Sequence, residues 1–206
     1  IVMTGFTANS KDSEVLLNGS SVGNLDWDLT GTHNVSNALA AIAAARHVGV
    51  VPRDSLAHLS GFLGVKRRME LVAKATSATL YDDFAHHPTA IRTTLAGLRA
   101  KVKDQPIYAL LEPRSHTMRL GHHQDQLGEA CASADRVFWL KHENLAFNLD
   151  LAVAEQGHLT FESTEAFIES IRENLVRESQ HVHLVMMSNG AFDTLKTALI
   201  KMMHDV

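Results

Sequence analysis

Hydrophobic residues follow two different periods along the chain, and each change of period marks a predicted element. From residue 65 onward, short apolar runs are followed by stretches in which apolar residues recur every three or four positions. Runs of the first kind are typical of buried strands, and stretches of the second kind are typical of amphipathic helices. The predicted strands are residues 69–75, 78–82, 107–112, 136–140 and 182–187, the predicted helices are residues 88–102, 125–132, 165–178 and 192–203, and residues 149–153 form a short apolar segment.

Strands that alternate with helices predict an α/β fold. Because the crossover between two parallel strands is right-handed, this pattern favours a Rossmann-like, doubly wound and mainly parallel sheet. The residues before it follow a different pattern, since apolar residues flank the turn pair Asn18-Gly19. That arrangement predicts a β-hairpin made of residues 14–17 and 22–29.

Two helices and a boundary are predicted after the hairpin. Residues 34–47 are rich in alanine with apolar residues on one face, and Pro52 suits the first turn of a second, short helix. Residues 59–64 then carry two glycines and little periodicity, which is typical of a linker. We therefore expect two domains, residues 1–60 and residues 61–206.

Composition narrows the class of protein. A hydrophobic content of 45% suffices for a packed core, and a net charge of −4 argues against a nucleic-acid surface. The longest apolar run, residues 38–45, is far shorter than a membrane span. The single cysteine, Cys131, cannot form an internal disulfide, so a cytoplasmic location is expected. The chain opens on Ile1 rather than methionine, which suggests that it begins inside a longer protein.

The strongest candidate for chemistry is the stretch 82–89, Asp-Asp-Phe-Ala-His-His-Pro-Thr. It joins a predicted strand to a predicted helix that starts at Pro88. In open α/β sheets, ligands bind at the carboxyl ends of the strands, where helix N-termini attract anions. The same residues also suit an ordinary solvated turn with a helix cap, so on the residues alone both interpretations stay open.

Three further groups of polar residues could likewise bind a ligand or have an ordinary structural role. Asn34 and Asn37 share a helix face and could bind an adenine edge, although Asn34 could also simply cap the helix. The run Lys66-Arg67-Arg68 is usually a solvated face, but one guanidinium could turn toward phosphate oxygens. Arg114-Ser115-His116 follows a strand and precedes a helix, as residues at the carboxyl edge of a sheet do.

Metal and phosphate-loop motifs are absent from the sequence. The pairs His86-His87 and His122-His123 are adjacent histidines, which rarely point at one ion, and neither His-Glu-x-x-His nor a cysteine pair occurs. No metal site is therefore predicted. The chain also lacks the Gly-x-x-x-x-Gly-Lys-Ser/Thr loop that cradles nucleotide phosphates.

Four stretches together resemble the Mur ligases, the ATP-dependent amide-bond-forming enzymes of bacterial cell-wall synthesis that act on UDP-N-acetylmuramate. The resemblance covers nearly the whole chain. Glu112-Pro113-Arg114-Ser115 and Met187-Ser188-Asn189-Gly190 are most similar to the branch that reattaches the recycled tripeptide L-alanyl-γ-D-glutamyl-meso-diaminopimelate. The four stretches are residues 31–41, 64–70, 82–89 and 112–118.

The resemblance implies a role for each candidate residue. It makes residues 1–60 the end of a central ATP-binding domain and residues 61–206 the C-terminal domain. ATP would be the cofactor, with magnesium held mainly by residues upstream of Ile1, so the chain alone is expected to be inactive. The residues implied for ATP are Asn34 and Asn37 at adenine, Arg68 at phosphate and Asp83 at ribose, and those implied for the peptide are His86, His87, Arg114, Ser115 and His116.

The resemblance leaves one residue open and leads to further expectations. His116 stands where the tripeptide-adding branch is expected to carry asparagine, which leaves the peptide contact open. Alanine at Arg68 or Asp83 is expected to leave folding intact, as at exposed sites.

Two alternative functions stay open. One is that of the L-alanine-adding relative, against which Glu112-Pro113-Arg114-Ser115 argues, and the other is that of a non-catalytic α/β binding module. UDP-N-acetylmuramate and the tripeptide are the expected partners of the whole protein, with no nucleic acid and no membrane.

Overall fold

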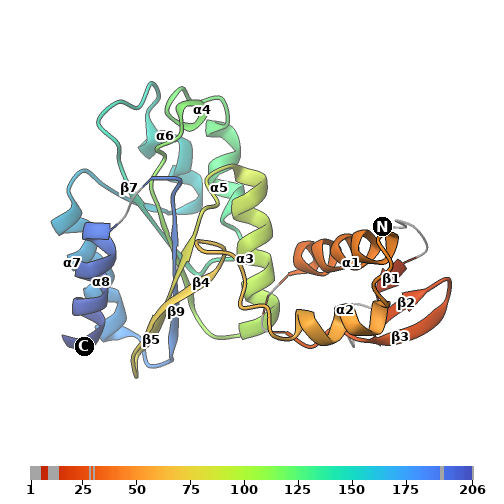
Figure 1. Ribbon diagram of the computed structural model, residues 1–206. Coiled ribbons are helices and arrows are strands. Elements are labelled where there is room, and N and C mark those ends of the chain that lie inside the picture. The colour runs from red at the N-terminus through yellow and green to blue at the C-terminus, as the bar shows by residue number, and fades with distance from the viewer. Residues whose placement is uncertain (1–5, 9–13, 28, 30, 191–192, 206) are drawn as a thin grey trace. The chain divides into compact units, whose positions relative to one another are not determined.

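The chain divides into two compact units. The computed structural model describes residues 6–8, 14–27, 29, 31–190 and 193–205, and the units comprise Ile1–Gly64 and Val65–Val206 (Figure 1). The second unit therefore begins a few residues after the predicted boundary. The assignment of the two units to particular domains of a longer protein stays a prediction.

The first unit combines a small antiparallel sheet with two helices. The turn at Asn18-Gly19 has φ angles of 50° and 81°, which is the left-handed backbone that a two-residue hairpin turn requires. A strand before the hairpin was not predicted, because residues 1–12 carry no alternating pattern. The elements are β1 (Phe6–Ala8), β2 (Glu14–Leu17), β3 (Ser20–Asn24), α1 (Thr32–His47) and α2 (Pro52–Leu59), and the strand order is β1-β2-β3.

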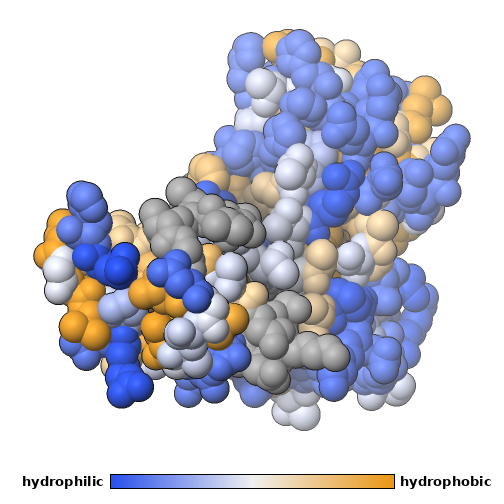
Figure 2. Space-filling view, turned by 90° about the vertical axis from the view of Figure 1, so that its right-hand side faces the viewer, coloured by the Kyte–Doolittle hydropathy of each residue, from blue (hydrophilic) through white to orange (hydrophobic). Residues whose placement is uncertain are grey.

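The first unit has a small core and several exposed apolar side chains. Helix α1 buries Ala38, Leu39 and Ile42 against the sheet and α2. Among the exposed residues are Val48 and Val51, with 78% and 57% of their surfaces accessible. Hydrophobic residues also interrupt the polar surface in the space-filling view (Figure 2). This unit therefore has exposed apolar side chains that do not belong to its own core.

The second unit is built on a six-stranded sheet, which confirms the predicted fold class. Only β4 runs antiparallel to its neighbour, and the remaining strand pairs are parallel. The strands are β4 (Glu70–Lys74), β5 (Ala78–Asp83), β6 (Ile107–Leu111), β7 (Arg136–Leu140), β8 (Leu159–Phe161) and β9 (Val182–Met187), in the order β4-β5-β9-β6-β7-β8. The last strand of the chain thus lies in the middle of the sheet.

The helices of the second unit depart from the predicted ones in a few places. In place of one helix over residues 125–132 there are two short helices within residues 124–130, and residues 149–153 are helical. Strand β8 and helix α4 were not predicted, and Phe192, the predicted start of the last helix, lies outside the described residues. The helices are α3 (Pro88–Val102), α4 (His116–Arg119), η1 (Gln124–Gln126), α5 (Leu127–Ala130), α6 (Leu149–Val153), η2 (Ala154–Gln156), α7 (Thr164–Arg177) and α8 (Asp193–Asp205).

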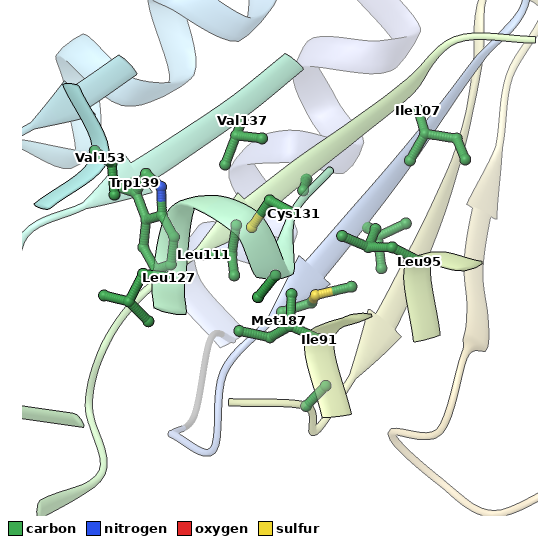
Figure 3. Close-up of a cluster of buried hydrophobic side chains, with 14 of the residues drawn as sticks. Ile91, Leu95, Ile107, Leu111, Leu127, Cys131, Val137, Trp139, Val153 and Met187 are labelled. Atoms are coloured by element: carbon green, nitrogen blue, oxygen red, sulfur yellow. The ribbon is translucent and has the colours of Figure 1, made fainter. Parts of the chain in front are cut away.

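Two apolar clusters sandwich this sheet. Helices α7 and α8 cover one face, where Leu184 and Met186 of β9 point, and α3, α5 and α6 cover the other (Figure 1). On that second face, Trp139, Cys131 and Met187 belong to the buried cluster (Figure 3). In the described part of the chain we find no helix with the length and apolar character to cross a membrane.

A buried histidine joins strands near the amino end of β9. Only 8% of His183 is exposed. Its Nε2 lies 2.8 Å from Gln105 Oε1, and its Nδ1 lies 3.3 Å from the hydroxyl of Tyr81. Because the amide oxygen accepts, Nε2 donates, and in the neutral ring Nδ1 accepts the hydroxyl of Tyr81. Burial, with a smaller contribution from the neighbouring His181, lowers the pKa of His183 to about 4.

We expect His183 to make stability fall as the pH is lowered. An unfolded histidine binds its proton near pH 6.5, whereas folded His183 binds it only near a pKa of about 4. Between these values the unfolded state holds the extra proton, so the free energy of unfolding should decrease by about 1.4 kcal/mol per pH unit. Urea unfolding of wild type and His183→Gln between pH 4.5 and 6.5 measures this. The variant should show the shallower dependence on pH, and equal slopes would contradict the assignment.

Candidate functional site

Four loops meet at one edge of the sheet in the second unit. Residues 84–87 follow β5, residues 112–115 follow β6 and residues 188–190 follow β9, so all three lie at carboxyl ends of parallel strands. Residues 66–69 join them because β4 is antiparallel, and its first residue, Glu70, pairs with Asp82. The candidate residues of this unit thus share one edge, which is where an open α/β sheet binds its ligands.

Asp83 is buried and its carboxylate already has hydrogen-bond donors. Only 3% of the residue is exposed. Oδ2 accepts the backbone N–H of Met69 at 2.8 Å, and Oδ1 accepts that of Ala85 at 2.7 Å. Burial raises the pKa of Asp83, although these two N–H groups and the charge of nearby Arg68 oppose the shift. The expectation of an exposed carboxylate is therefore wrong, while the predicted ribose contact stays a prediction.

Arg68 is the outward member of the pair Arg67-Arg68. Its side chain is exposed, and its guanidinium carbon lies 5.5 Å from the centre of the Phe84 ring. Arg67 approaches the same ring at 5.3 Å but lies further inside. Arg67 and Met69 have φ angles of 57° and 51°, so the backbone turns sharply on both sides of Arg68. An exposed guanidinium near Asp83 is suited to a phosphate, as predicted for Arg68.

Arg67 was not singled out from the sequence, yet it makes more contacts than Arg68. Its Nη2 donates to the carbonyl oxygens of Ser188 and Gly190 at 2.5 and 2.8 Å. Its backbone N–H donates to Glu70 Oε2 at 2.8 Å. Nothing in a run of three basic residues distinguishes the one that turns inward, because its partners lie far along the chain.

The buried Asp82 and the half-buried Lys196 form an ion pair that sequence analysis also missed. Asp82 is 1% exposed, and Lys196 Nζ donates to its Oδ2 at 2.6 Å. Arg67 Nε lies 3.5 Å from the other carboxylate oxygen. Lys196 comes from α8, more than a hundred residues after Asp82, so no local pattern could have paired them.

The two histidines of the 82–89 stretch have different neighbours. His86 Nδ1 lies 3.0 Å from the carbonyl oxygen of Phe84. His87 is the N-cap of α3, where its Nδ1 accepts the backbone N–H of Thr89 at 3.3 Å. The ring of His87 also packs on His123, with centroids 4.3 Å apart. Slight burial and the neighbouring His123 lower the pKa of His87.

The arrangement of these histidines does not form a metal site. Within the described ranges, no group of three or more histidine, cysteine, aspartate or glutamate side chains is placed to hold an ion. Cys131 lies in the apolar cluster, away from these histidines, and burial raises the pKa of its thiol to about 12.

The loop after β6 presents the predicted peptide residues. Arg114 Nε lies 3.5 Å from Glu112 Oε1, and the pKa of Glu112 is raised by burial, against the effect of this arginine. Ser115 Oγ caps α4 by accepting the backbone N–H of Met118 at 3.3 Å. His116 is exposed at the first position of that helix. Ser115 therefore has a structural role, while Arg114 and His116 reach the surface of this edge.

Arg114 also lies across the loop after β9. A Cβ atom added to Gly190 would stand 2.5 Å from Arg114 Cδ. Beside it, Asn189 Oδ1 is buried and accepts no hydrogen bond from the described residues. A buried carbonyl oxygen without a donor is costly, so Asn189 Oδ1 requires a donor from outside the described residues.

In the first unit, the two candidate asparagines lie on one face of α1. Asn37 Nδ2 is 3.4 Å from Asn34 Oδ1, and Asn37 is exposed. The N-cap of α1 is Gly31, which makes no side-chain capping bond, so Asn34 does not have the capping role that the sequence left open. A role of either residue at adenine stays a prediction.

Comparisons with known proteins show that the chain is similar to Mur ligases. Residues 67–190 match the family described as Mur ligase, glutamate ligase domain. The chain is 41% identical over 94% of its length to the UDP-N-acetylmuramate–L-alanyl-γ-D-glutamyl-meso-2,6-diaminoheptandioate ligase of Escherichia coli, of which it covers 42%. A UDP-N-acetylmuramate–L-alanine ligase of Synechococcus is 36% identical over 63% of the chain and 24% of that relative.

A solved structure agrees with the sequence comparisons. The murein peptide ligase of Psychrobacter arcticus superposes with a TM-score of 0.69 and 34% identity, and the match covers 98% of this chain and 44% of that one. The chain is thus homologous to the C-terminal part of such ligases, and it spans less than half the length of these relatives.

We expect Asp83→Ala and Arg68→Ala to differ in stability. Alanine at 83 leaves the N–H groups of Met69 and Ala85 without their acceptor, which should lower the free energy of unfolding by about 1–3 kcal/mol. Alanine at the exposed Arg68 should lower it by less than about 0.5 kcal/mol. Urea unfolding at pH 7 measures both variants. Equal midpoints for the two variants would show that the Asp83 bonds do not support the fold.

Proposed function

Since the chain belongs to the Mur ligase family, we propose that it is the C-terminal part of an ATP-dependent ligase that joins L-alanyl-γ-D-glutamyl-meso-diaminopimelate to UDP-N-acetylmuramate. The observation that carries this proposal is the 41% identity to a tripeptide-adding relative over 94% of the chain. The grouping of loops 66–69, 84–87, 112–115 and 188–190 at one edge of the sheet supports it, because an enzyme must bring its substrate contacts together.

The L-alanine-adding relative is the second candidate. It is supported by a shorter match, which covers 63% of this chain in the Synechococcus relative. The position of Arg114 favours the tripeptide, since a guanidinium at this edge suits the carboxylates of a peptide. A non-catalytic binding module is the weaker alternative, because the relatives that match the chain are named as ligases.

For ATP, the chain offers a phosphate contact more readily than a ribose contact. Arg68 is exposed and carries the planar fork that phosphate oxygens accept. Asp83 would have to share oxygens that now accept Met69 and Ala85. Bound ATP would supply the phosphoryl group that activates a carboxylate for amide-bond formation. The magnesium ligands and the phosphate loop belong, in this proposal, to residues outside the chain.

For the peptide, we assign the contacts to the loops after β6 and β9. Arg114 and His116 would bind carboxylates of the peptide, and Asn189 Oδ1, which has no donor among the described residues, would accept an N–H group. His86 is the better of the two histidines for substrate, because His87 already caps α3 and packs on His123. Ser115 would act through its cap, by fixing the start of α4 beside Arg114.

The first unit is, in this proposal, the end of a larger ATP-binding domain that contributes Asn34 and Asn37. The exposed Val48 and Val51 support this, since further chain packed on that unit would remove apolar surface from water. A cytoplasmic location is part of the same proposal. The buried, unpaired Cys131 supports it, because a reducing compartment requires no disulfide.

We expect the full-length parent to couple ATP hydrolysis to attachment of the tripeptide, with little turnover of free L-alanine. A coupled ADP-release assay with UDP-N-acetylmuramate and either amine substrate measures this. Preferential use of L-alanine would contradict the proposal.

In the same assay, Arg114→Ala should raise the KM for tripeptide by about tenfold, as the loss of one charged hydrogen bond predicts, and should change the KM for ATP little. Lys201→Met, on the exposed face of α8, is the matched control.

We expect the 206-residue chain by itself to fold but not to bind ATP tightly or hydrolyse it. The second unit has its own sheet and two cores, so it does not need further chain to fold. Nucleotide affinity in such enzymes comes largely from a phosphate loop and magnesium, and this sequence encodes no such loop. Calorimetric titration with ATP and magnesium tests this, and micromolar affinity would reveal a complete nucleotide site in the chain.

A further inference from the structure

At the carboxyl edge of the sheet, two cations face the same buried carboxylate, that of Asp82. Asp82 is 1% exposed. Lys196 Nζ lies 2.6 Å from its Oδ2, and Arg67 Nε lies 3.5 Å from its Oδ1. The lysine therefore makes the close contact, while the arginine stands at the limit of hydrogen-bonding distance. The negative charge of Asp82 is therefore neutralised mainly by Lys196 of α8.

Arg67 uses the rest of its guanidinium elsewhere. Nη2 donates to the carbonyl oxygens of Ser188 and Gly190 at 2.5 and 2.8 Å. These two bonds hold the loop after β9 against the loop before β4. The side chain of Arg114 lies across Gly190 on this same loop, at 2.5 Å from a Cβ that any larger residue would place there. Arg67 thus fixes the surface on which Arg114 rests.

We propose that Lys196 is a positioning residue for the peptide side of the site. By neutralising Asp82, it leaves the Arg67 guanidinium available to hold the loop of residues 188–190 under Arg114. The part of this inference that concerns the peptide rests on the proposed function. The part that concerns the loop rests only on the contacts of Asp82, Arg67 and Lys196.

The physical reason is a competition for one guanidinium. A carboxylate and an arginine prefer a two-bond, fork-to-fork geometry, and such a charged pair is stronger than a bond to a neutral carbonyl. Without Lys196, the buried charge of Asp82 would have Arg67 as its only close cation in the described part of the chain. An uncompensated buried charge is costly, so Arg67 would turn toward Asp82 and release Ser188 and Gly190.

The nucleotide side should respond much less than the peptide side. Met69 and Ala85 donate to Asp83 without involving Lys196, and Arg68 points outward beside Phe84. These contacts hold the residues assigned to ATP whether or not Arg67 reaches the loop. A loss confined to peptide use therefore distinguishes a positioning role from general destabilisation.

A set of variants tests the competition directly. Lys196→Met removes the charge and keeps most of the volume, and Lys196→Arg keeps the charge. The double variant Lys196→Met/Asp82→Asn removes the carboxylate as well, so Arg67 has no reason to leave the loop. Lys201→Met removes an exposed lysine from the same helix and serves as the matched control.

In the 206-residue chain, amide hydrogen exchange reports the loop directly. The N–H groups of Ser188 and Gly190 now donate to Asp83 O and Ser188 Oγ at 3.3 and 3.0 Å. We expect Lys196→Met to speed their exchange by about tenfold, and the double variant and Lys196→Arg to restore it to within about threefold of wild type. Exchange that is unchanged in Lys196→Met, or faster still in the double variant, would overturn the inference.

In the full-length parent, steady-state kinetics report the consequence for the peptide. Lys196→Met should raise the KM for tripeptide by about tenfold with the KM for ATP within about twofold, and the double variant should recover most of the loss. Equal losses for both substrates would overturn the positioning role. If the parent does not use the tripeptide at all, the proposed function fails, and the exchange measurement still decides the role of Lys196 in the loop.

Discussion

A carboxylate that is almost completely removed from water must be neutralised where it lies, and at Asp82 this requirement ties distant segments together. The neutralising groups are Lys196 from α8 and Arg67 from the loop before β4. Arg67 then extends the connection to the carbonyls of Ser188 and Gly190. The edge of the sheet where the candidate residues gather is therefore held by charge as well as by backbone pairing, and its loops are not independent of one another.

The order of the strands makes this arrangement possible. Strand β9, the last in the chain, pairs with β5 on one side and β6 on the other, so its terminal loop lies between theirs. Helices on both faces bury the alternating side chains of β9, as expected for a strand inside the sheet. Because only β5 separates β9 from β4, residues 188–190 lie within reach of Arg67.

Within the site, the side chains divide into those that hold the loops and those that face outward. Asp83, His87 and Ser115 accept backbone N–H groups and so fix the starts of β4, α3 and α4. Arg68 and His116 are exposed at the same edge. A Mur ligase motif thus contains both supporting and contacting residues, and the motif letters alone do not tell them apart. This is why Asp83 was expected to be exposed although it is buried.

The sequence by itself determined the fold class, the bounds of α3, β7 and β9, and the edge at which the motifs would meet. These features follow from local period, turn chemistry and the parallel topology, which nearby residues encode. Only the tertiary structure decided that Arg67 turns inward while Arg68 turns outward, that Lys196 neutralises Asp82, and that β8 exists. Such features depend on partners more than a hundred residues away, or on a short segment whose pairing decides its conformation. Local patterns do not carry that information, because the free energy that selects these arrangements arises only when the sheet brings its edge loops together.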